Sequence, residues 1–213
     1  MSLVVPDRKI AVIIGYSGHA FVLADAAIKL GINLKYYSET AVKNNNPFQL
    51  EYLGFDGNRN FSGYGKKYLF MIGIGDNVVR MNIAQRLLSI GEQLTSVIHP
   101  SANIASKVSV GNGVFISGNA TINPLSIIND YAIINTGSII EHECRIGTSV
   151  HIGPGAVLAG NVNVGNMSFI GANAVIKQGI SIGVNVVVGA GAVVLNDIPD
   201  NTIVVGNPAK TIK

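Results

Sequence analysis

The sequence predicts two architectures in one chain, a small α/β domain followed by a parallel β-helix. A strand–turn–helix–strand pattern fills the N-terminal part, and an aliphatic residue stands at every sixth position from Ile98 to Val194. A six-residue period matches neither a helix nor a single strand, and is typical of short strands stacked into coils. We therefore expect domains over 1–97 and 98–213.

The N-terminal domain is expected to be Rossmann-like. Runs of β-branched and other apolar residues predict strands over 9–14, 32–37 and 68–74, and helical spacing predicts helices over 20–30 and 78–90. Strand, helix and strand in this order form a parallel βαβ unit. Residues 43–66, rich in Asn, Gly and Tyr, are expected to form a loop with one short strand.

In the repeats, three hexads form one triangular coil, and coils stack at about 4.8 Å. Gly or Asn often follows the repeat aliphatic, as at Gly111, Asn123 and Gly147, and we expect these residues to serve tight turns, including turns with positive φ. Cys144 stands at an inward repeat position, which predicts a packing role.

The composition of the chain limits the partners and the compartment that we expect for the protein. The formal net charge is +3 and no basic run exceeds Lys66–Lys67, which argues against a nucleic-acid surface. One cysteine excludes an internal disulfide and fits a reducing compartment. The sequence has no apolar stretch of membrane-spanning length, and its N-terminus has no apolar core of signal-peptide length. We expect a cytoplasmic protein without a membrane partner.

The charged residues of the β-helix are few and gather around His142. Between 104 and 194 the charged side chains are Lys107, Asp130, Glu141, Glu143, Arg145 and Lys177. A histidine flanked by carboxylates is a natural general base, because a carboxylate on one ring nitrogen raises the basicity of the other. The alternative is a solvated charged corner without function.

His151 lies half a coil beyond His142, so the two histidines cannot share one side of the same prism. They could meet only across a boundary between neighbouring prisms. This offset motivates the hypothesis of an active site shared between subunits, most simply in a homotrimer.

Several motifs together resemble one family. They are Gly15-Tyr-Ser-Gly-His19, Ile72-Gly-Ile-Gly-Asp-Asn77, Asn135-Thr-Gly-Ser-Ile-Ile-Glu-His-Glu-Cys144, His151-Ile-Gly-Pro-Gly-Ala156, Leu158-Ala-Gly-Asn161 and the ending Ile198 to Lys210. The chain resembles sugar acyltransferases of the left-handed β-helix superfamily, in the sialic acid O-acetyltransferase-like and nucleotide-aminosugar N-acetyltransferase group. The resemblance implies acetyl-CoA as cosubstrate, a nucleotide-linked amino sugar as acceptor, and no metal.

The resemblance also implies roles for residues of the β-helix. His142 matches the catalytic base, and Glu143 matches the carboxylate that raises its basicity. Asn135 matches a residue near the acceptor sugar. Acetyl-CoA contacts are implied for His151, for Ala172 and for the Gly160 N–H, which would stabilise the thioester oxyanion.

In the N-terminal domain the resemblance implies a nucleotide-sugar site. Gly15 and Gly18 would let the backbone approach a diphosphate at the start of a helix, and His19 would contact the ligand. Tight strand-to-helix turns also favour glycine, so this motif alone is weak evidence. The substrate-binding residues expected here are Gly15, Ser17, Gly18, His19, Ser38 and Gly75, the last two because they follow strands.

The leading interpretation is an acetyl-CoA-dependent N-acetyltransferase of a nucleotide-linked amino-dideoxy sugar, serving bacterial surface glycan or glycoprotein synthesis. A sugar O-acetyltransferase is the alternative, although a hydroxyl acceptor needs fuller proton removal than an amine. A β-helix hydratase would need three histidines on zinc, and His142 and His151 are the only histidines on the prism. A non-catalytic scaffold would leave the Glu-His-Glu cluster unexplained.

Overall fold

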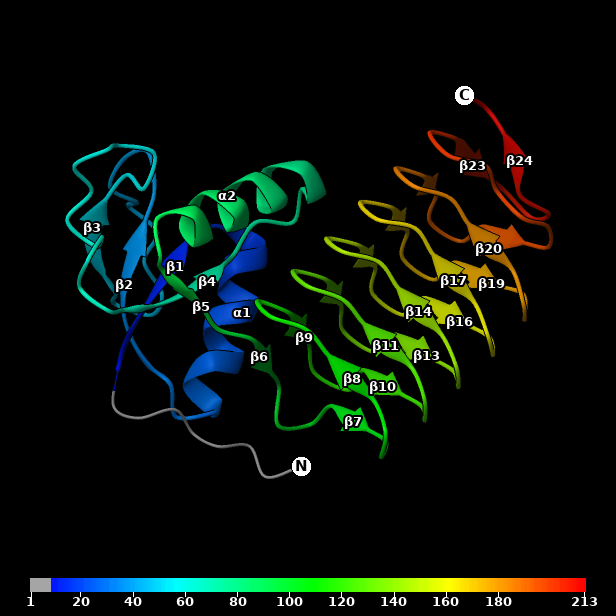
Figure 1. Cartoon of the computed structure of the whole chain (residues 1–213), viewed down its shortest axis with the longest axis horizontal. Helices are drawn as coiled ribbons and strands as arrows, with labels where there is room; N and C mark the ends of the chain where they lie inside the picture. Colours follow the sequence, from blue (N-terminus) through cyan, green and yellow to red (C-terminus); the bar gives the residue numbers. More distant parts are fainter. Residues whose placement is uncertain (1–8) are drawn as a thin grey trace. The chain divides into compact units, whose positions relative to one another are not determined.

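The computed structural model describes residues 9–213, which divide into two compact units (Figure 1). The first unit ends at Pro100 and the second runs from Ser101 to Lys213, so the division falls shortly after the expected one. The expectation about an N-terminal targeting segment also involves residues 1–8, which lie outside the described residues. No helix in the described part is long and apolar enough to cross a membrane.

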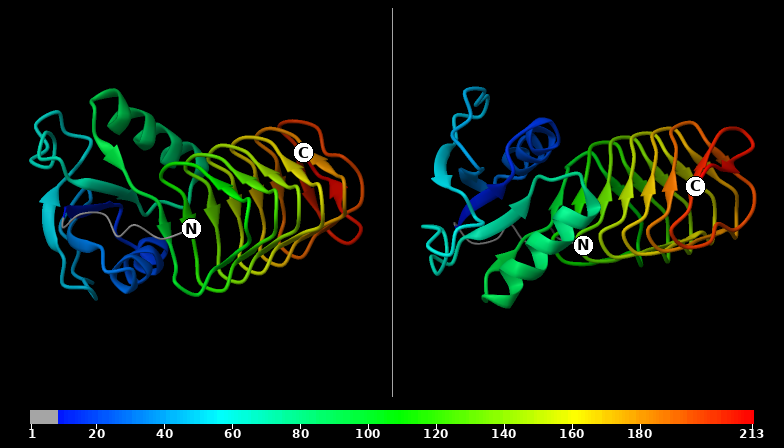
Figure 2. Two further views of the ribbon diagram at one scale, coloured as in Figure 1. Left: turned by 60° about the horizontal axis from the view of Figure 1, so that its bottom comes forward. Right: turned by 90° about the horizontal axis from the view of Figure 1, so that it is seen from above.

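The first unit is a five-stranded parallel sheet with strand order β3-β2-β1-β4-β5. Two crossovers leave β1 and β4 in opposite directions, and right-handed crossovers then place α1 and α2 on opposite faces of the sheet (Figures 1 and 2). The elements are β1 (Ile10–Ile14), α1 (Gly18–Lys29), β2 (Asn33–Ser38), β3 (Glu51–Gly54), β4 (Leu69–Ile72), α2 (Asn77–Ser89), β5 (Gln93–Leu94) and β6 (Val97–Ile98).

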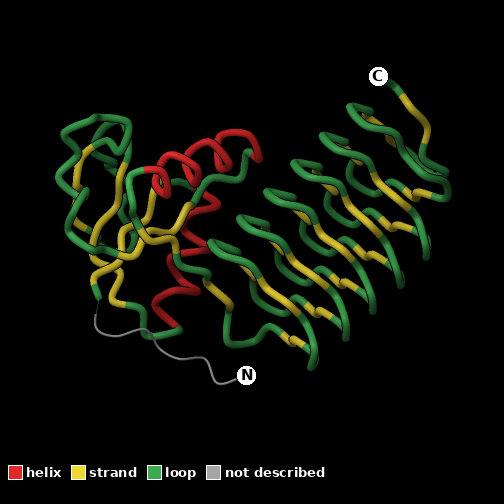
Figure 3. Tube along the Cα trace, viewed as in Figure 1, coloured by secondary structure: helices red, strands yellow, loops and turns green. Residues whose placement is uncertain are grey.

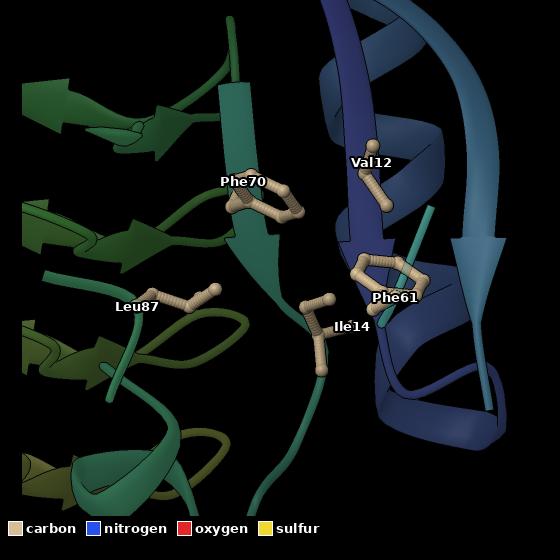
Figure 4. Close-up of a cluster of buried hydrophobic side chains, with 5 residues drawn as sticks. All are labelled: Val12, Ile14, Phe61, Phe70 and Leu87. Atoms are coloured by element: carbon tan, nitrogen blue, oxygen red, sulfur yellow. The ribbon is translucent and has the colours of Figure 1, made fainter. Parts of the chain in front are cut away.

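This pattern confirms the predicted strand–helix–strand unit and the short strand within 43–66, and it adds β5, which the sequence analysis missed. The core on the α2 side contains Val12 and Ile14 of β1, Phe70 of β4, Leu87 of α2 and Phe61 (Figure 4). Alternation along β1 sends Val12 and Ile14 to the same face of the sheet. All five residues are at least nine-tenths buried.

The second unit is a parallel β-helix whose short strands form three faces (Figure 3). Its strands have two residues each, except β23 with three, and the last strand, β24, pairs antiparallel with β23. The first face contains β7 (Asn103–Ile104), β10 (Thr121–Ile122), β13 (Ile139–Ile140), β16 (Val157–Leu158), β19 (Val175–Ile176) and β22 (Val193–Val194). The second contains β8 (Ser109–Val110), β11 (Ile127–Ile128), β14 (Arg145–Ile146), β17 (Asn163–Val164) and β20 (Ser181–Ile182). The third runs through β9 (Phe115–Ile116), β12 (Ile133–Ile134), β15 (His151–Ile152), β18 (Phe169–Ile170), β21 (Val187–Val188), β23 (Ile203–Val205) and β24 (Lys210–Thr211).

The repeat aliphatics fill the interior of the prism. From Ile116 to Val194 none is more than 4% exposed, and Cys144 is fully buried among them, as predicted. Strand pairing carries each residue onto the one eighteen positions later, as for Ile122 and Ile140. A residue at a corner therefore lies directly over its counterpart in the next coil.

The turns correct one expectation. Positive φ falls on the third residue after the repeat aliphatic, for example at Glu143 and Asn161, and not on the first. Glycines at the first position serve close approach instead, because a Cβ on Gly147 would lie 2.7 Å from the backbone nitrogen of Asn166 in the next coil. Coil stacking therefore explains these glycines better than turn conformation does.

Candidate active site

His142 and Glu143 form an exposed, hydrogen-bonded pair at the corner between β13 and β14. Their Nδ1 and Oε2 atoms are 3.0 Å apart, and their side chains are 49% and 56% exposed. Glu143 has φ of +63°, a conformation that the sharp corner imposes. A carboxylate accepts only from a protonated nitrogen, so Nδ1 carries the proton and the Nε2 lone pair of neutral His142 remains able to take another.

Gly160 lies beneath the imidazole ring of His142, one coil further along the helix. A Cβ at Gly160 would lie 2.5 Å from Cε1 and 2.6 Å from Nε2 of His142. The backbone N–H of Asn161 donates to the His142 carbonyl at 2.8 Å and holds the two coils in register. Any larger residue at this position would displace the ring from where it lies.

His151 and Asn135 form a second group. Asn135 Nδ2 is 3.1 Å from His151 Nε2, while Asn135 Oδ1 accepts the Thr136 N–H at 2.8 Å. The amide can only donate to the ring, so Nε2 of His151 is the acceptor and its proton sits on Nδ1. His151 is 8% exposed and packs edge-on against Phe169, with ring centroids 5.1 Å apart.

The β-helix residues expected in the site therefore fall into two groups within one chain. His142, Glu143 and Gly160 share the corner between the first and second faces. Asn135 and His151 belong to the third face and the corner after it, and Ala172 lies on that corner next to Gly171, which is one coil beyond Gly153. No contact between the two groups is seen among the described residues.

In the first unit, the loops after β1 and β4 pack against each other. Gly15 has φ of +81°, and a Cβ there would lie 2.7 Å from Ile74 Cγ1. A Cβ on Gly73 would lie 2.5 Å from Ala20 Cβ. These two glycines are required by packing, whereas nothing lies within 4 Å of a Cβ built on Gly18. The open approach to this pair of loops is therefore at Gly18, where α1 begins.

Ser17 precedes α1, and its side chain makes no capping hydrogen bond to the helix. A serine at this position usually accepts from a backbone N–H of the first turn. The Ser17 hydroxyl is instead exposed beside Gly18. Its position fits a residue that donates to a ligand.

His19 lies behind these loops. Burial first, and the Arg80 charge second, lower the pKa of His19 to about 4, so its ring is neutral near pH 7. Arg80, which the sequence analysis missed, donates from Nη1 to the carbonyls of Ile74 and Gly75 at 3.1 and 2.9 Å. An arginine one helical turn after a Gly-Ile-Gly-Asp loop was the available signal.

The structure corrects the expectation for Ser38. Its side chain is fully buried, donates to Asp56 Oδ1 at 2.8 Å and accepts the Asp56 N–H at 2.9 Å. Asp56 in turn pairs with Arg86 of α2. The Ser38 carbonyl accepts the Gly15 N–H at 2.9 Å, so Ser38 supports the glycine loop from behind and offers no hydroxyl to a ligand. The position of Ser38 at the end of a strand could not reveal that its side chain is buried.

Replacing Asp56 with alanine is expected to lower stability by about 2 kcal/mol, because the Ser38 hydroxyl and the Arg86 guanidinium lose a buried acceptor. The matched control is Asp25→Ala, which breaks an exposed carboxylate–lysine pair with Lys29 and should cost under about 0.5 kcal/mol. Thermal melts of the three proteins measure the difference. Equal melting temperatures for the two variants would contradict the role of Asp56.

The lowered pKa of His19 predicts a pH-dependent stability. Above pH 6.5 the ring is neutral in both the folded and unfolded states, and the full stability is present. As the pH falls from 6.5 through about 4, the unfolded chain takes up the proton first, so up to about 3 kcal/mol is lost. Between about pH 7 and about pH 4.5, the melting temperature should fall less for His19→Gln than for the wild type. An equal fall would contradict the assignment to His19.

A metal site is not prearranged in this part of the chain. Among residues 9–213 no three His, Cys, Asp or Glu side chains converge as ligands would. The pKa of the Cys144 thiol is raised, chiefly by burial, so the thiol is a poor nucleophile. At the His142 corner, the imidazole paired with the Glu143 carboxylate is a group that can take up and release a proton.

Both units resemble known proteins. Residues 10–87 match the PglD N-terminal domain, and residues 161–196 match the hexapeptide repeat of succinyl-transferase. A curated relative, the GDP-perosamine N-acetyltransferase of Escherichia coli O157:H7, is 34% identical over 91 residues. That aligned stretch spans 43% of this chain and 41% of the relative.

Two solved structures align along nearly the full chain. PerB from Caulobacter crescentus, in complex with CoA and GDP-perosamine, has 34% identity and a TM-score of 0.87, with 95% of this chain and 97% of that chain covered. The acetyltransferase domain of PglB from Neisseria gonorrhoeae FA1090, in complex with acetyl coenzyme A, has 31% identity and a TM-score of 0.91, with 97% and 100% covered. These matches confirm the predicted fold, and the chain belongs to the family of left-handed β-helix (hexapeptide-repeat) sugar acetyltransferases, within the sialic acid O-acetyltransferase-like and nucleotide-aminosugar N-acetyltransferase group.

Proposed function

We propose that the protein is an acetyl-CoA-dependent N-acetyltransferase that acts on the amino group of a nucleotide-linked amino-dideoxy sugar. The observation that carries this proposal is the His142–Glu143 pair held over Gly160, in a chain of a sugar acetyltransferase family. The relatives named above act on GDP-perosamine or bind acetyl coenzyme A, which favours an amine acceptor over a hydroxyl. The product would serve bacterial surface glycan or glycoprotein synthesis in the cytoplasm.

In the proposed reaction, the sugar amine attacks the thioester carbonyl carbon of acetyl-CoA. His142 Nε2 takes one proton from the amine as the N–C bond forms, and the Glu143 carboxylate stabilises the imidazolium through Nδ1. The C–S bond then breaks, and the imidazolium returns the proton to the CoA thiolate. The Gly160 N–H is proposed as the donor to the oxyanion of the intermediate. No protein nucleophile is needed, in agreement with a buried, protonated Cys144.

The proposed nucleotide site comprises the loops after β1 and β4 in the first unit. Gly18 offers open space at the start of α1, and the exposed Ser17 hydroxyl lies beside it. A diphosphate would suit this position, because helix N-termini bind anions. The named relatives make GDP the first nucleotide to test, with UDP, dTDP and CDP as comparisons.

The experiment that tests this part is a thermal-shift screen of nucleoside diphosphates. A ligand at 100 times its Kd should add about 2.7 kcal/mol and raise the melting temperature of the protein. Gly18→Val should abolish the shift, because its side chain would fill the open space. Val22→Ala, on the exposed side of α1, is the control and should retain the shift. No shift with any nucleoside diphosphate would contradict the proposed acceptor class.

We also propose a homotrimer with active sites between subunits. The outward residues of the first face include an aliphatic column, in which Ile139 is 36% and Val175 is 40% exposed, whereas the equivalent column of the second face contains Arg145, Asn163 and Ser181. An exposed aliphatic column suits contact with a second copy. Such contact could bring His142 of one subunit toward His151 of the next.

Mixing two inactive variants tests this arrangement. If each site uses His142 from one subunit and His151 from its neighbour, randomly assembled trimers of His142→Ala and His151→Ala chains should recover about a quarter of the wild-type activity. Light scattering on the wild type should report three chains per particle. A mixture that stays inactive after denaturation and joint refolding, or a monomeric active enzyme, would contradict the shared site.

A further inference from the structure

Two polar side chains lie one coil apart inside the prism, behind the corner that carries His142. Ser126 and Cys144 are fully buried, and strand pairing places them next to each other in one interior column. The other members of this column are aliphatic, namely Val108, Val162 and Ile180. A buried polar group is costly unless it is hydrogen-bonded, so the contacts of Ser126 and Cys144 indicate what they do.

The Ser126 hydroxyl bridges the two ends of the turn 141–144. Its Oγ donates to the Glu141 carbonyl at 2.8 Å and accepts the Cys144 N–H at 3.2 Å. In several other corners the carbonyl of the first residue and the N–H of the fourth bond each other directly, at 3.2–3.4 Å. His142 and Glu143 are the two central residues of the bridged turn. The hydroxyl therefore fixes the segment from which both of these side chains project.

The Cys144 thiol makes the equivalent contact one coil further along. Its Sγ donates to the carbonyl of Ala159, the first residue of the turn 159–162, at 3.3 Å. Burial is the main cause that raises the pKa of the thiol, so the thiol stays protonated near pH 7 and is able to donate. The peptide between Ala159 and Gly160 is trans, and in a trans peptide the C=O and N–H bonds point in opposite directions. With the Ala159 carbonyl turned toward the interior, the Gly160 N–H points to the outside of the prism.

We propose that Ser126 and Cys144 are positioning residues for acetyl transfer. Ser126 holds the turn from which the base His142 and its partner Glu143 project, and Cys144 directs the Gly160 N–H toward the oxyanion. Both residues act from inside the prism and touch no substrate, because both are fully buried. The inference rests on the proposed function, since it takes His142 as the base and Gly160 as the oxyanion donor.

The same β-helix offers a matched control. Ser168 is also fully buried, and its Oγ donates to the Gly183 carbonyl at 2.7 Å and accepts the Val186 N–H at 2.9 Å. These partners stand 15 and 18 residues after the serine, as they do for Ser126. The turn 183–186 carries no proposed catalytic residue. Ser168→Ala and Ser126→Ala should therefore lower the melting temperature by similar amounts, whereas only Ser126→Ala should lower kcat.

Steady-state kinetics of Ser126→Ala and Cys144→Ala test the proposal. We expect kcat to fall about tenfold in each variant, because a displacement of about 1 Å in a catalytic group can cost about a hundredfold and these turns are loosened without being removed. KM for both substrates should stay within about twofold of the wild type. Ser126→Cys and Cys144→Ser keep a hydrogen-bond donor and should retain at least about half of the wild-type kcat. In the His142→Ala background, Ser126→Ala should cause no further loss of kcat.

The outcomes separate the two proposals. A wild type that acetylates no nucleotide-linked amino sugar, or a His142→Ala variant as fast as the wild type, would overturn the proposed function and this inference with it. If His142→Ala is slow while folded Ser126→Ala and Cys144→Ala keep the wild-type kcat, the positioning roles alone are overturned. An equal loss of kcat in Ser168→Ala would have the same meaning.

Should the alanine variants fail to fold, Ser126→Val and Cys144→Val replace them. Valine stands at positions 108 and 162 of the same interior column, so the prism accepts this side chain in neighbouring coils. Neither valine can donate a hydrogen bond, and the same fall of about tenfold in kcat is expected. A wild-type kcat in these two variants would overturn the inference.

Discussion

Replacing His142 with alanine is expected to lower kcat for acetyl transfer by a factor of about 10²–10⁴, because the sugar amine loses the group that takes its proton. The exposed ring lies at a corner of the prism and packs on Gly160 without filling the core, so the melting temperature should be nearly unchanged. Steady-state kinetics with saturating acetyl-CoA measure the effect. Retention of more than about a tenth of the wild-type kcat would exclude His142 as the base.

The two carboxylates beside His142 provide a matched pair for the same experiment. Glu143 accepts from Nδ1 of His142, so Glu143→Gln removes the charge that stabilises the imidazolium and should lower kcat about tenfold. The structure gives Glu141 no corresponding contact with the ring, although its backbone N–H joins the same coils at 2.9 Å. Glu141→Gln should leave kcat within about twofold of the wild type. Equal losses of kcat in Glu143→Gln and Glu141→Gln would mean that the net charge near His142 matters, and not the hydrogen bond between Glu143 and His142.

The second large effect is expected from Gly160→Ala. The added methyl group would lie 2.5 Å from Cε1 of His142, so the ring must move. A displacement of about 1 Å in a catalytic group can cost about a hundredfold, and we expect kcat to fall by about 10–10². Circular dichroism should show a normal fold, because the neighbouring ring is exposed and can swing aside into solvent.

A double-mutant cycle shows whether this loss acts through His142. If Gly160→Ala works by displacing the base, the His142→Ala and Gly160→Ala double variant should be no slower than His142→Ala alone. If the factors by which the two single changes lower kcat multiply in the double variant, Gly160 acts independently of His142, as an oxyanion donor whose geometry the added methyl group disturbs. The cycle thus separates the steric role of Gly160 from its proposed role in binding the oxyanion.

The fold was largely predictable because its main determinants are periodic. Each hexad repeats the burial of one aliphatic, so the register predicts every strand of the prism from Ile104 to Val194, and Cys144 follows as a buried residue. The ends obey the pattern less fully. Ile104 and Val110 are only half-buried in the first coil of the second unit, where fewer coils flank them.

The prediction of the site was uneven, for identifiable physical reasons. His142 and Glu143 stand out in the sequence because charged residues are rare in the repeats. The two residues are adjacent in the chain, and their side chains pair in the structure. Ser38 depends on a contact with Asp56, 18 residues away, which no local pattern encodes. Arg80 contacts the Ile74 and Gly75 carbonyls, six and five residues earlier, so the Gly-Ile-Gly-Asp loop before it was a local signal that was missed. The position of positive φ, on the third residue of each turn, also comes from coil geometry.

Acetyl transfer to the amine of a nucleotide-linked sugar can be measured in a single assay. The purified protein is incubated with acetyl-CoA and matched pairs of nucleotide-linked sugars that differ only in an amino or a hydroxyl group at the same carbon. We expect CoA release and a product heavier by one acetyl group for the amino member of one pair, with none for His142→Ala. Acetylation of the hydroxyl member alone, or equal rates for His142→Ala and the wild type, would contradict the proposed function.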